Sequence, residues 1–404
     1  MKIRSITVFC APGYPANRLL LQHLGIFANH ARALFTQAGF EVESLRLALP
    51  PFSSFVEPRR LAEAAPELSI EAHAEGFEYL SLGPAQTGDL EAYPRIPEAL
   101  AGTHGVFFSG LLTTPQGAVS LPAAKACAQI ITQLAALSPD GFSNLNFCAS
   151  ANVPPYAPFF PAAYAENAAP AFALAMEAAD LALNVFSAAR SLEEARQTLI
   201  SEVESAANKL ESAAQKLSQI YHYVFKGLDF TLAPFPQENI SIARALESLG
   251  LPAFGLSGSV FASAFLTDTL DRARCTRTGF NGLMLPVLED SGLAQRAAEG
   301  RLSAEELLLC SAVCGTGLDV IPLPGDTNAE QLYPLLLDLA ALALRLNKPL
   351  TARLMPIPGK KAGDPTEFDF TYFANSRVMP LRSEKSVGLL SGSESVPIAR
   401  REPR

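Results

Sequence analysis

The feature that most constrains the fold is a regular alternation of strand-like and helix-like segments that begins at the first residues. Lys2–Phe9 has the apolar pattern of a strand, and apolar side chains at steps of three and four then indicate a helix from about Ala16 to Gly39. Further strands are predicted at Phe40–Leu47, Phe77–Leu82, Gly105–Leu112, Asn144–Ala149, Leu181–Phe186, Leu228–Leu232, Gly282–Val287, Leu318–Ile321 and Thr351–Met355. Helical stretches separate most of them, which favours an α/β fold with a mainly parallel sheet buried by helices. About ten strands are many for an open sheet, so a closed barrel is the preferred architecture.

The composition is that of a folded protein with an aliphatic and Phe-based core. The chain has 404 residues, of which 49% are hydrophobic and 18% charged, and it contains no Trp. We expect one barrel domain over residues 1–380. Residues 381–404 are rich in Ser, Gly and charge, and we expect them to form a poorly ordered tail.

Charge and hydropathy limit the partners. The net charge of −9 lacks the basic footprint of a nucleic-acid-binding protein. No apolar run approaches the ~20 residues of a membrane span, and the start MKIRSITVF lacks a signal-peptide profile. We therefore expect a cytoplasmic protein that binds neither nucleic acid nor membrane. Six cysteines without a C-x-x-C pair are typical of reduced thiols.

The clearest single element is a long helix from Ser191 to about Phe225. Ser191 and Glu194 form a capping-box pattern, apolar residues follow at steps of three and four, and Gly227 is the predicted stop. Two interpretations are open. The apolar stripe is either the seam of a homodimer or the inner face of a scaffold helix packed on its own domain.

Two runs punctuated by Gly and Pro place reactive side chains on loops in the last third of the chain. The first, AVCGTGLDVIPLPGDT (residues 312–327), contains Cys314, Gly317 and Asp319. Cys314 is either a nucleophile with a lowered pKa or a buried thiol, and Asp319 is a candidate acid/base or metal ligand. Asp326 is predicted to cap the helix Asn328–Leu346.

The second run, LTARLMPIPGKKAGD (residues 350–364), offers basic groups. Arg353 lies on an apolar strand, so it is either paired or bound to an anion. Lys360 follows Gly359 in a turn that offers backbone N–H groups and ammonium groups to a carboxylate or phosphate, or is simply solvated.

Two further segments are candidates because ligands often bind at the carboxyl ends of strands. Thr231 and Pro234 stand at the end of the strand in LDFTLAPFP. Ser257 and Gly258 precede an apolar helix, where they either bind an anion or cap the helix.

The common catalytic motifs are absent from the sequence. No G-x-G-x-x-G follows the first strand, and there is no Walker A, H-E-x-x-H, G-x-S-x-G or kinase motif. His23 and His30 lie too far apart on one helix to bind one metal directly. The sequence therefore assigns neither a cofactor nor a metal.

The stretch from about Gly227 to Met379 resembles the domain of unknown function family 711, whose bacterial and archaeal members are often labelled PFL-like. The matching runs are LDFTLAPFP, SIARALESLGL, GFNGLMLPVLEDSGL, CGTGLDVIPLPGDT and LTARLMPIPGKKAGDPTEF. The resemblance extends less closely to the N-terminal half through VFFSGLLTTPQG, NFCASANVPPYAPF and LALNV.

The resemblance implies a fold like that of pyruvate formate-lyase, a closed ten-stranded α/β barrel with a hairpin loop inside. Radical enzymes of this fold carry a thiyl cysteine on that loop and a glycyl radical near the C-terminus. Cys275, in RARCTRTGFNG, is the best candidate for the loop thiol. The string nearest to the glycyl motif is Arg377-Val378-Met379-Pro380, which has no Gly, so radical chemistry is not expected.

Together these observations predict a non-radical enzyme, either a lyase or a hydrolase, that binds a small carboxylate or phosphate metabolite. Cys275, Cys314 and Asp319 are the candidate catalytic residues. The candidate ligand-binding residues are Thr231, Pro234, Ser257, Gly258, Asn281, Gly317, Arg353 and Lys360.

Two alternatives remain. One is a non-catalytic metabolite sensor or dimeric assembly protein that uses the long helix as its interface. The other is a metal-assisted hydrolase or lyase that uses Asp229, Asp319 and Asp364.

Overall fold

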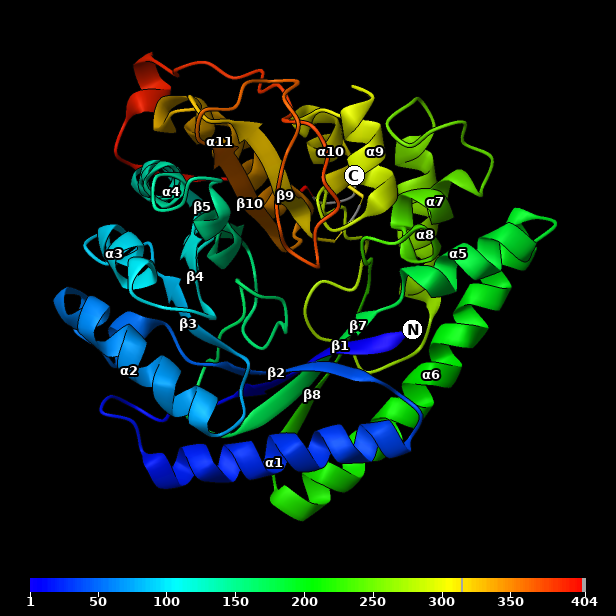
Figure 1. The fold of residues 1–404 in the computed structure, drawn as a ribbon, viewed down its shortest axis with the longest axis horizontal. Helices are drawn as coiled ribbons and strands as arrows, with labels where there is room; N and C mark the ends of the chain where they lie inside the picture. The colour runs from blue at the N-terminus through cyan, green and yellow to red at the C-terminus, as the bar shows by residue number, and fades with distance from the viewer. Residues whose placement is uncertain (314, 402–404) are drawn as a thin grey trace.

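The computed structural model describes residues 1–313 and 315–401 and contains a nine-stranded mixed sheet surrounded by helices (Figure 1). Five parallel strands form one part of the sheet, in the order β1-β2-β3-β4-β6. They are β1 (Lys2–Phe9), β2 (Val42–Ala48), β3 (Tyr79–Ala85), β4 (Val106–Leu111) and β6 (Phe147–Ala151).

The four other strands of this sheet run in the opposite direction. They are β7 (Ala171–Glu177), β8 (Val224–Ala233), β9 (Gly317–Pro324) and β10 (Leu350–Ile357). β7 pairs antiparallel with β1 and parallel with β8, whereas β10 pairs antiparallel with β6 and parallel with β9. One edge of the sheet therefore gathers the amino ends of the first five strands and the carboxyl ends of the other four.

The predicted α/β fold is confirmed, but the closed ten-stranded barrel is not. β8 and β9 are the two edge strands of the sheet, and within the described residues they do not pair with each other by hydrogen bonds. The predicted strand Gly282–Val287 does not form a named strand. It makes one isolated parallel bridge, from Pro286 to Asp319, and a second such bridge joins Arg277, five residues before it, to Leu228.

Helices cover the outside of the strands, which face a common interior (Figure 1). They are α1 (Arg18–Gln37), α2 (Leu61–Ala74), α3 (Ile96–Ala101), α4 (Leu121–Ala135), α5 (Ala179–Ala188), α6 (Leu192–Tyr221), α7 (Ile242–Glu247), α8 (Ser259–Arg272), α9 (Ser291–Ala298), α10 (Ala304–Ser311) and α11 (Ala329–Leu346). In the described part of the chain, no helix combines the length and the apolar character that crossing a membrane would require.

The segment between β6 and α6 differs from the sequence-based prediction. Leu181–Phe186, predicted as a strand, lies inside α5, and the strand β7 just before it was missed. A six-residue apolar run is too short to separate a strand period from a helix period. The sequence AFALAME of β7 is rich in alanine, which favours a helix when taken alone.

The long helix α6 begins where predicted and ends earlier. The Ser191 side chain accepts a hydrogen bond from the Glu194 N–H, and the Glu194 carboxylate accepts from Arg190 N–H rather than from Ser191. His222 ends the helix in a left-handed conformation with φ of 58°. The predicted end at Phe225 is wrong because β8 already begins at Val224.

The apolar stripe of α6 is buried against the rest of its own chain. The buried positions run from Ala195 to Leu217 and belong to the main core cluster between helices and strands. This packing favours the scaffold interpretation, because the stripe proposed as a dimer seam is already covered. The homodimer itself stays a prediction.

Helix α11 is capped by a different residue from the one predicted. The Asn328 side chain accepts from Gln331 N–H, and the Gln331 side chain accepts from Asn328 N–H, which completes a capping box. Asp326 lies exposed in the preceding turn, two residues too early to cap the helix.

The tail, predicted to be poorly ordered, packs on the domain as far as the described residues extend. The short strand β11 (Ser395–Pro397) pairs antiparallel with β5 (Ala118–Ser120). The Tyr333 hydroxyl donates to the Leu390 carbonyl at 2.6 Å, and Lys125 Nζ donates to the Ser391 carbonyl at 2.7 Å. The tail thus lies across α4 and α11.

Candidate functional site

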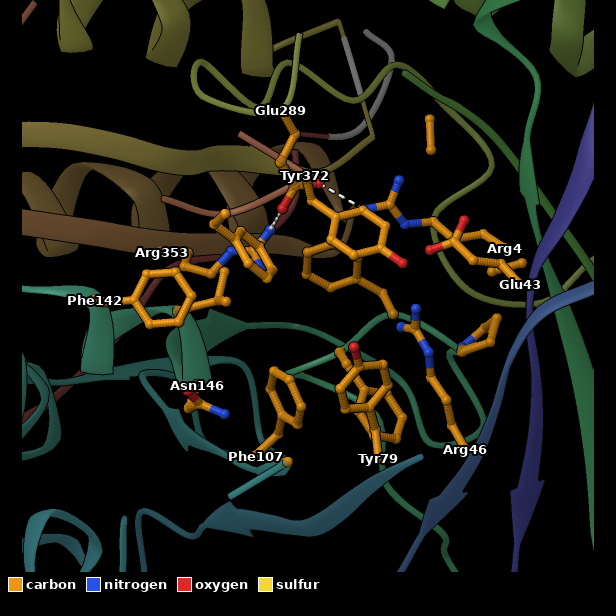
Figure 2. A pocket seen from close by; sticks show the side chains of 18 of the residues that line it. Arg4, Glu43, Arg46, Tyr79, Phe107, Phe142, Asn146, Glu289, Arg353 and Tyr372 are labelled. Carbon is orange, nitrogen blue, oxygen red and sulfur yellow. Dashed lines mark hydrogen bonds and ion pairs between the residues drawn. The ribbon is translucent and has the colours of Figure 1, made fainter. Parts of the chain in front are cut away.

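A cavity of about 500 Å³ opens at the edge where the two groups of strands bring opposite ends together. Its wall carries three guanidinium groups, Arg4 from β1, Arg46 from β2 and Arg353 from β10. Aromatic side chains surround them, and Figure 2 shows several of these reaching into the same space. They are Tyr79, Phe107, Phe142, Phe159, Phe160, Phe370 and Tyr372.

Glu289 bridges two of the three arginines. Its Oε2 contacts Arg4 Nη2 at 2.7 Å and its Oε1 contacts Arg353 Nη2 at 2.9 Å (Figure 2). Burial alone would raise the pKa of Glu289, but Arg353 and Arg4 outweigh it and hold this pKa below its usual value. Glu289 therefore stays ionised and ties β1 to β10 across the cavity.

Arg353 has a second carboxylate partner in Asp319. Arg353 Nε donates to Asp319 Oδ1 at 2.6 Å, and Asp319 is fully buried on β9. Burial raises the pKa of Asp319, against the opposing effect of Arg353, and Asp319 Oδ2 has no hydrogen-bond partner. Two of the five N–H donors of Arg353 are therefore engaged by buried carboxylates of the described chain.

Arg46 differs from the other two because no carboxylate of the described chain lies within the 4.0 Å of an ion pair. Its Nε donates to Ser44 Oγ at 2.9 Å. The guanidinium carbon lies 5.4 Å from the Tyr79 ring centre and 5.3 Å from that of Phe160. Burial, and then the charge of Arg4, lower the pKa of Arg46 to about 10, so it is still a cation at neutral pH.

Glu43 lies on the same strand as Arg46 and lines the same cavity. Its Oε2 is buried and accepts no hydrogen bond from the described residues. Burial and then the charge of Glu43 raise the pKa of Tyr372 to about 12. Burial raises the pKa of Glu177 to about 7, with Arg4 opposing and Glu43 adding to the rise. Glu43 and Tyr372, which line the cavity, thus interact with Glu177, which is buried behind the lining.

A turn at residues 279–281, called the inner turn here, is held by Asp229 of β8. Its carboxylate accepts four hydrogen bonds, from Thr231 N and Oγ1 and from the N–H groups of Phe280 and Asn281. Gly279 in this turn has φ of +77°, and a Cβ there would lie 2.3 Å from Asp229 Oδ2. The turn is therefore fixed on β8 at the cavity wall.

Comparisons with known proteins place the chain in a family. The family model described as Uncharacterised ACR (DUF711) matches residues 1–375. The chain belongs to the DUF711 family. The predicted resemblance is therefore confirmed.

Relatives of this DUF711 protein occur in archaea and bacteria. A UPF0210 protein of Pyrobaculum aerophilum is 31% identical over 382 residues, which cover 90% of this chain and 84% of the relative. A UPF0210 protein of Methanosarcina barkeri is 30% identical over 384 residues, covering 92% and 83%. One from Lactobacillus delbrueckii subsp. bulgaricus is 27% identical over 394 residues, covering 91% and 85%. The names of these relatives state no activity, so the site is the basis for any functional proposal.

Some predicted ligand-binding residues of the DUF711 chain come together at the cavity. Thr231 and Arg353 line it, and the Pro234 carbonyl accepts from Arg4 Nη1 at 3.1 Å. Asn281 supports the inner turn, since its Oδ1 accepts from Phe230 N–H and its Nδ2 donates to the Thr278 carbonyl. Asp319 does not line the cavity and acts on Arg353, so the structure does not support it as an acid/base in contact with ligand.

Other predicted ligand-binding residues lie away from the cavity lining. Ser257 and Gly258 are exposed before α8, and Gly258 is its N-cap residue. Lys360 Nζ pairs with Glu367 at 2.6 Å. Gly317 allows a close approach of β9 to β10, because a Cβ there would lie 2.3 Å from the Thr351 carbonyl oxygen. Their roles in this structure are local and structural.

The predicted nucleophiles gain no support from the geometry. Cys275 is half-buried outside the cavity lining, next to Thr276, whose N–H donates to Glu211 of α6 at 2.5 Å. Burial raises the pKa of the Cys275 thiol, which is the reverse of what a thiolate nucleophile requires. Cys314 lies outside the described residues.

The metal-site alternative is not supported either. Among residues 1–313 and 315–401, no group of three or more His, Cys, Asp or Glu side chains could hold a metal ion. Asp229 is engaged with the inner turn, and the Asp364 carboxylate accepts from Lys361 N–H at 2.7 Å in its own loop. The three carboxylates therefore serve separate structures.

Sequence reasoning missed Arg46 and Glu43, although a signal was present. Both charges interrupt the apolar alternation of the strand predicted at Phe40–Leu47. A charged residue inside a strand of a buried sheet needs a partner or a ligand. This need for a partner or a ligand marked Arg353 as a candidate, and it marks Arg46 and Glu43 in the same way.

Proposed function

We propose that this DUF711 protein binds a small organic anion, a carboxylate or a phosphate, in the cavity, with Arg46 as its anchor. The observation that carries the proposal is the unpaired guanidinium of Arg46 beside two arginines that each have carboxylate partners. A cation held in a partly buried wall without a counter-ion is costly. A carboxylate or phosphate forms two parallel hydrogen bonds with a guanidinium and removes that cost.

The rest of the lining supports an organic ligand rather than a simple ion. A cavity of about 500 Å³ is in the range of metabolite sites. Phe107, Phe159 and Met284 give the wall an apolar side that inorganic phosphate would leave unused. We therefore expect the anion to carry an apolar body.

We also propose that residues 276–287, which contain the inner turn, link β8 to β9 and so close the ring. Support comes from hydrogen bonds at both ends. Leu228 N–H donates to the Thr276 carbonyl at 2.8 Å, and Val287 N–H donates to the Asp319 carbonyl at 3.1 Å. Closure would fix Asp229 and Glu289 relative to each other, because Asp229 holds the inner turn of this segment and Glu289 follows the end of the segment by two residues.

A second candidate function, non-radical proton transfer on the bound anion, is favoured by one observation. The pKa of Glu177 is raised to about 7, near the value at which a carboxyl group both donates and accepts protons at neutral pH. Glu177 acts beside Glu43, which lines the cavity. Exchange of a carbon-bound hydrogen of the ligand for deuterium in D₂O, lost in Glu177→Gln, would support this activity.

Thermal unfolding across a panel of organic acids and phosphate esters tests the anion proposal. A ligand at 100 times its Kd adds ~2.7 kcal/mol and raises the Tm by at least about one or two degrees. We expect the wild type and the control Arg18→Gln, whose side chain is exposed, to shift with the same compounds, and Arg46→Gln to shift with none. Equal shifts in Arg46→Gln and the wild type would overturn the assignment of Arg46.

A further inference from the structure

Among the described residues, Arg46 is not the only charged group on the cavity wall that lacks an ion-pair partner. Glu43 precedes it by three residues on β2, lines the same cavity, and leaves its buried Oε2 without a donor. In the part of the chain that the structure describes, no cation lies within ion-pair distance of Glu43. One strand therefore presents an unpaired positive and an unpaired negative group to a single cavity.

The other charges of the cavity already have partners. Arg4 and Arg353 share Glu289, Arg353 also holds Asp319, and Asp229 accepts its four hydrogen bonds from the inner turn and from Thr231. Tyr372 and Glu177 each share a side-chain hydrogen bond with Glu43, but neither is a cation, and Glu177 itself lies within ion-pair distance of Lys2 and Arg4. Arg4 and Arg46 act on Glu43 only from beyond ion-pair distance, so the cavity leaves room for a positive group of a ligand to pair with it directly.

We propose that the ligand is a zwitterion, an amino acid whose carboxylate binds Arg46 and whose ammonium group binds Glu43. This inference rests on the proposed anion function and adds the second charge. Three residues of a strand span about 10 Å, a distance that two long side chains and one zwitterion can bridge together. Figure 2 shows Arg46 and Glu43 entering the same side of the cavity, near Arg4.

The apolar side of the cavity selects the side chain of that amino acid. Phe107, Phe142 and Phe159 offer aromatic surface, and Met284 offers a flexible apolar contact. These contacts fit a large apolar or aromatic side chain. They leave a second charged side chain without a partner.

The experiment compares matched acids that differ only in the amino group. The dissociation constants of L-phenylalanine and 3-phenylpropanoate, and of L-leucine and 4-methylpentanoate, are measured by calorimetry on the intact chain. We expect each amino acid to bind at least about tenfold more tightly than its partner, because a charge-assisted hydrogen bond is lost with the amine. Glu43→Gln should remove this preference, because the amide cannot form an ion pair with the ammonium group. Glu202→Gln, an exposed position on α6, is the matched control and should keep it.

The outcomes separate this inference from the anion proposal. Simple acids that bind as tightly as the amino acids, in an Arg46-dependent manner, would refute the zwitterion and leave the anion site intact. Binding of phosphate esters alone would likewise refute the zwitterion and leave the anion site intact. If no anion of the panel binds, both proposals fail. Should Glu43→Gln not fold, the comparison of paired acids on the wild type still decides.

Discussion

At the scale of single residues, the three cavity arginines differ in what they contact, and this difference predicts different consequences of mutation. Arg353 neutralises two buried carboxylates, Glu289 and Asp319, whereas Arg46 contacts a serine hydroxyl and two aromatic rings. Removing one member of a buried ion pair leaves an uncompensated charge in the interior. Arg353 is therefore chiefly a stabilising residue and Arg46 chiefly a binding residue.

Replacing Arg353 by Ala should lower the free energy of unfolding by about 3–5 kcal/mol, because Asp319 and one oxygen of Glu289 lose their cation. Replacing Arg46 by Ala should lower it by less than about 1 kcal/mol, because no ion pair is broken. Urea denaturation of both variants measures the two values. Equal losses would mean that Arg46 has a buried partner after all.

A pair of glycines tests the role of Asp229. Gly279 and Gly359 have nearly equal φ values of +77° and +76°, but only Gly279 has a neighbour, Asp229 Oδ2, in the space of a Cβ. Gly359→Ala should cost about 1 kcal/mol of stability for the backbone conformation alone. Gly279→Ala should cost at least about 2 kcal/mol more, since it also displaces the inner turn. Similar losses in the two variants would show that Asp229 does not fix the turn.

Two of the predicted ligand-binding residues line the cavity, and both carry a strong local signal. Thr231 stands at the carboxyl end of a predicted strand, and Arg353 is a charge inside an apolar one. Glu289 joins Arg4 and Arg353, which lie hundreds of positions apart, and nothing local in the sequence marks that meeting. Cys275 was predicted from the family resemblance and Cys314 from its place before a glycine-rich turn, and only the structure could show that burial raises the pKa of Cys275.

At the scale of elements, helix α6 shows which features of a helix an apolar periodicity predicts and which it does not. Its thirty residues from Leu192 to Tyr221 follow the predicted steps, and Ser191 caps it as expected. The pattern shows that one face is apolar, but it does not say what covers that face. The structure answers this point, since the stripe packs on the chain's own core.

Leu210→Ala in α6 should cost about 2–5 kcal/mol of stability, because this side chain is fully buried. Ile220→Ala, at a position that is 58% exposed, should change stability by less than about 0.5 kcal/mol. Both losses should be independent of protein concentration in chemical denaturation. A loss at Leu210 that grew as the protein was diluted would restore the dimer-seam interpretation.

The misassigned elements share a cause. Leu181–Phe186 and the β7 strand lie next to each other in an alanine-rich stretch where strand and helix patterns look alike. Gly282–Val287 was predicted as a strand from its apolar residues, and it makes only an isolated bridge to β9. Long, strongly periodic elements were predictable, whereas short ones depend on their tertiary neighbours.

At the scale of the whole molecule, buried carboxyl groups make stability depend on pH. The pKa of Glu177 rises to about 7 and that of Asp290 to about 6, above their ordinary values of 4.5 and 3.8. The folded protein thus holds protons that the unfolded chain releases at lower pH. The free energy of unfolding should therefore fall as the pH rises from about 4 to about 7, and level off above that.

Glu177→Gln should remove the part of this dependence that belongs to Glu177, up to about 3 kcal/mol between pH 4.5 and pH 7. Denaturation midpoints of the wild type and of the variant at several pH values measure the difference, and Glu202→Gln is the exposed control. A variant whose pH profile matched that of the wild type would show that Glu177 titrates normally.

The central claim is that the cavity binds an organic anion through Arg46. The most direct measurement is a calorimetric titration of the tightest-binding acid from the panel into the wild type, Arg46→Gln and Arg18→Gln. We predict saturable binding to one site in the wild type and in Arg18→Gln, and at least about a hundredfold weaker binding in Arg46→Gln, since a bidentate charged contact is lost. Binding of equal strength to all three proteins would contradict the claim.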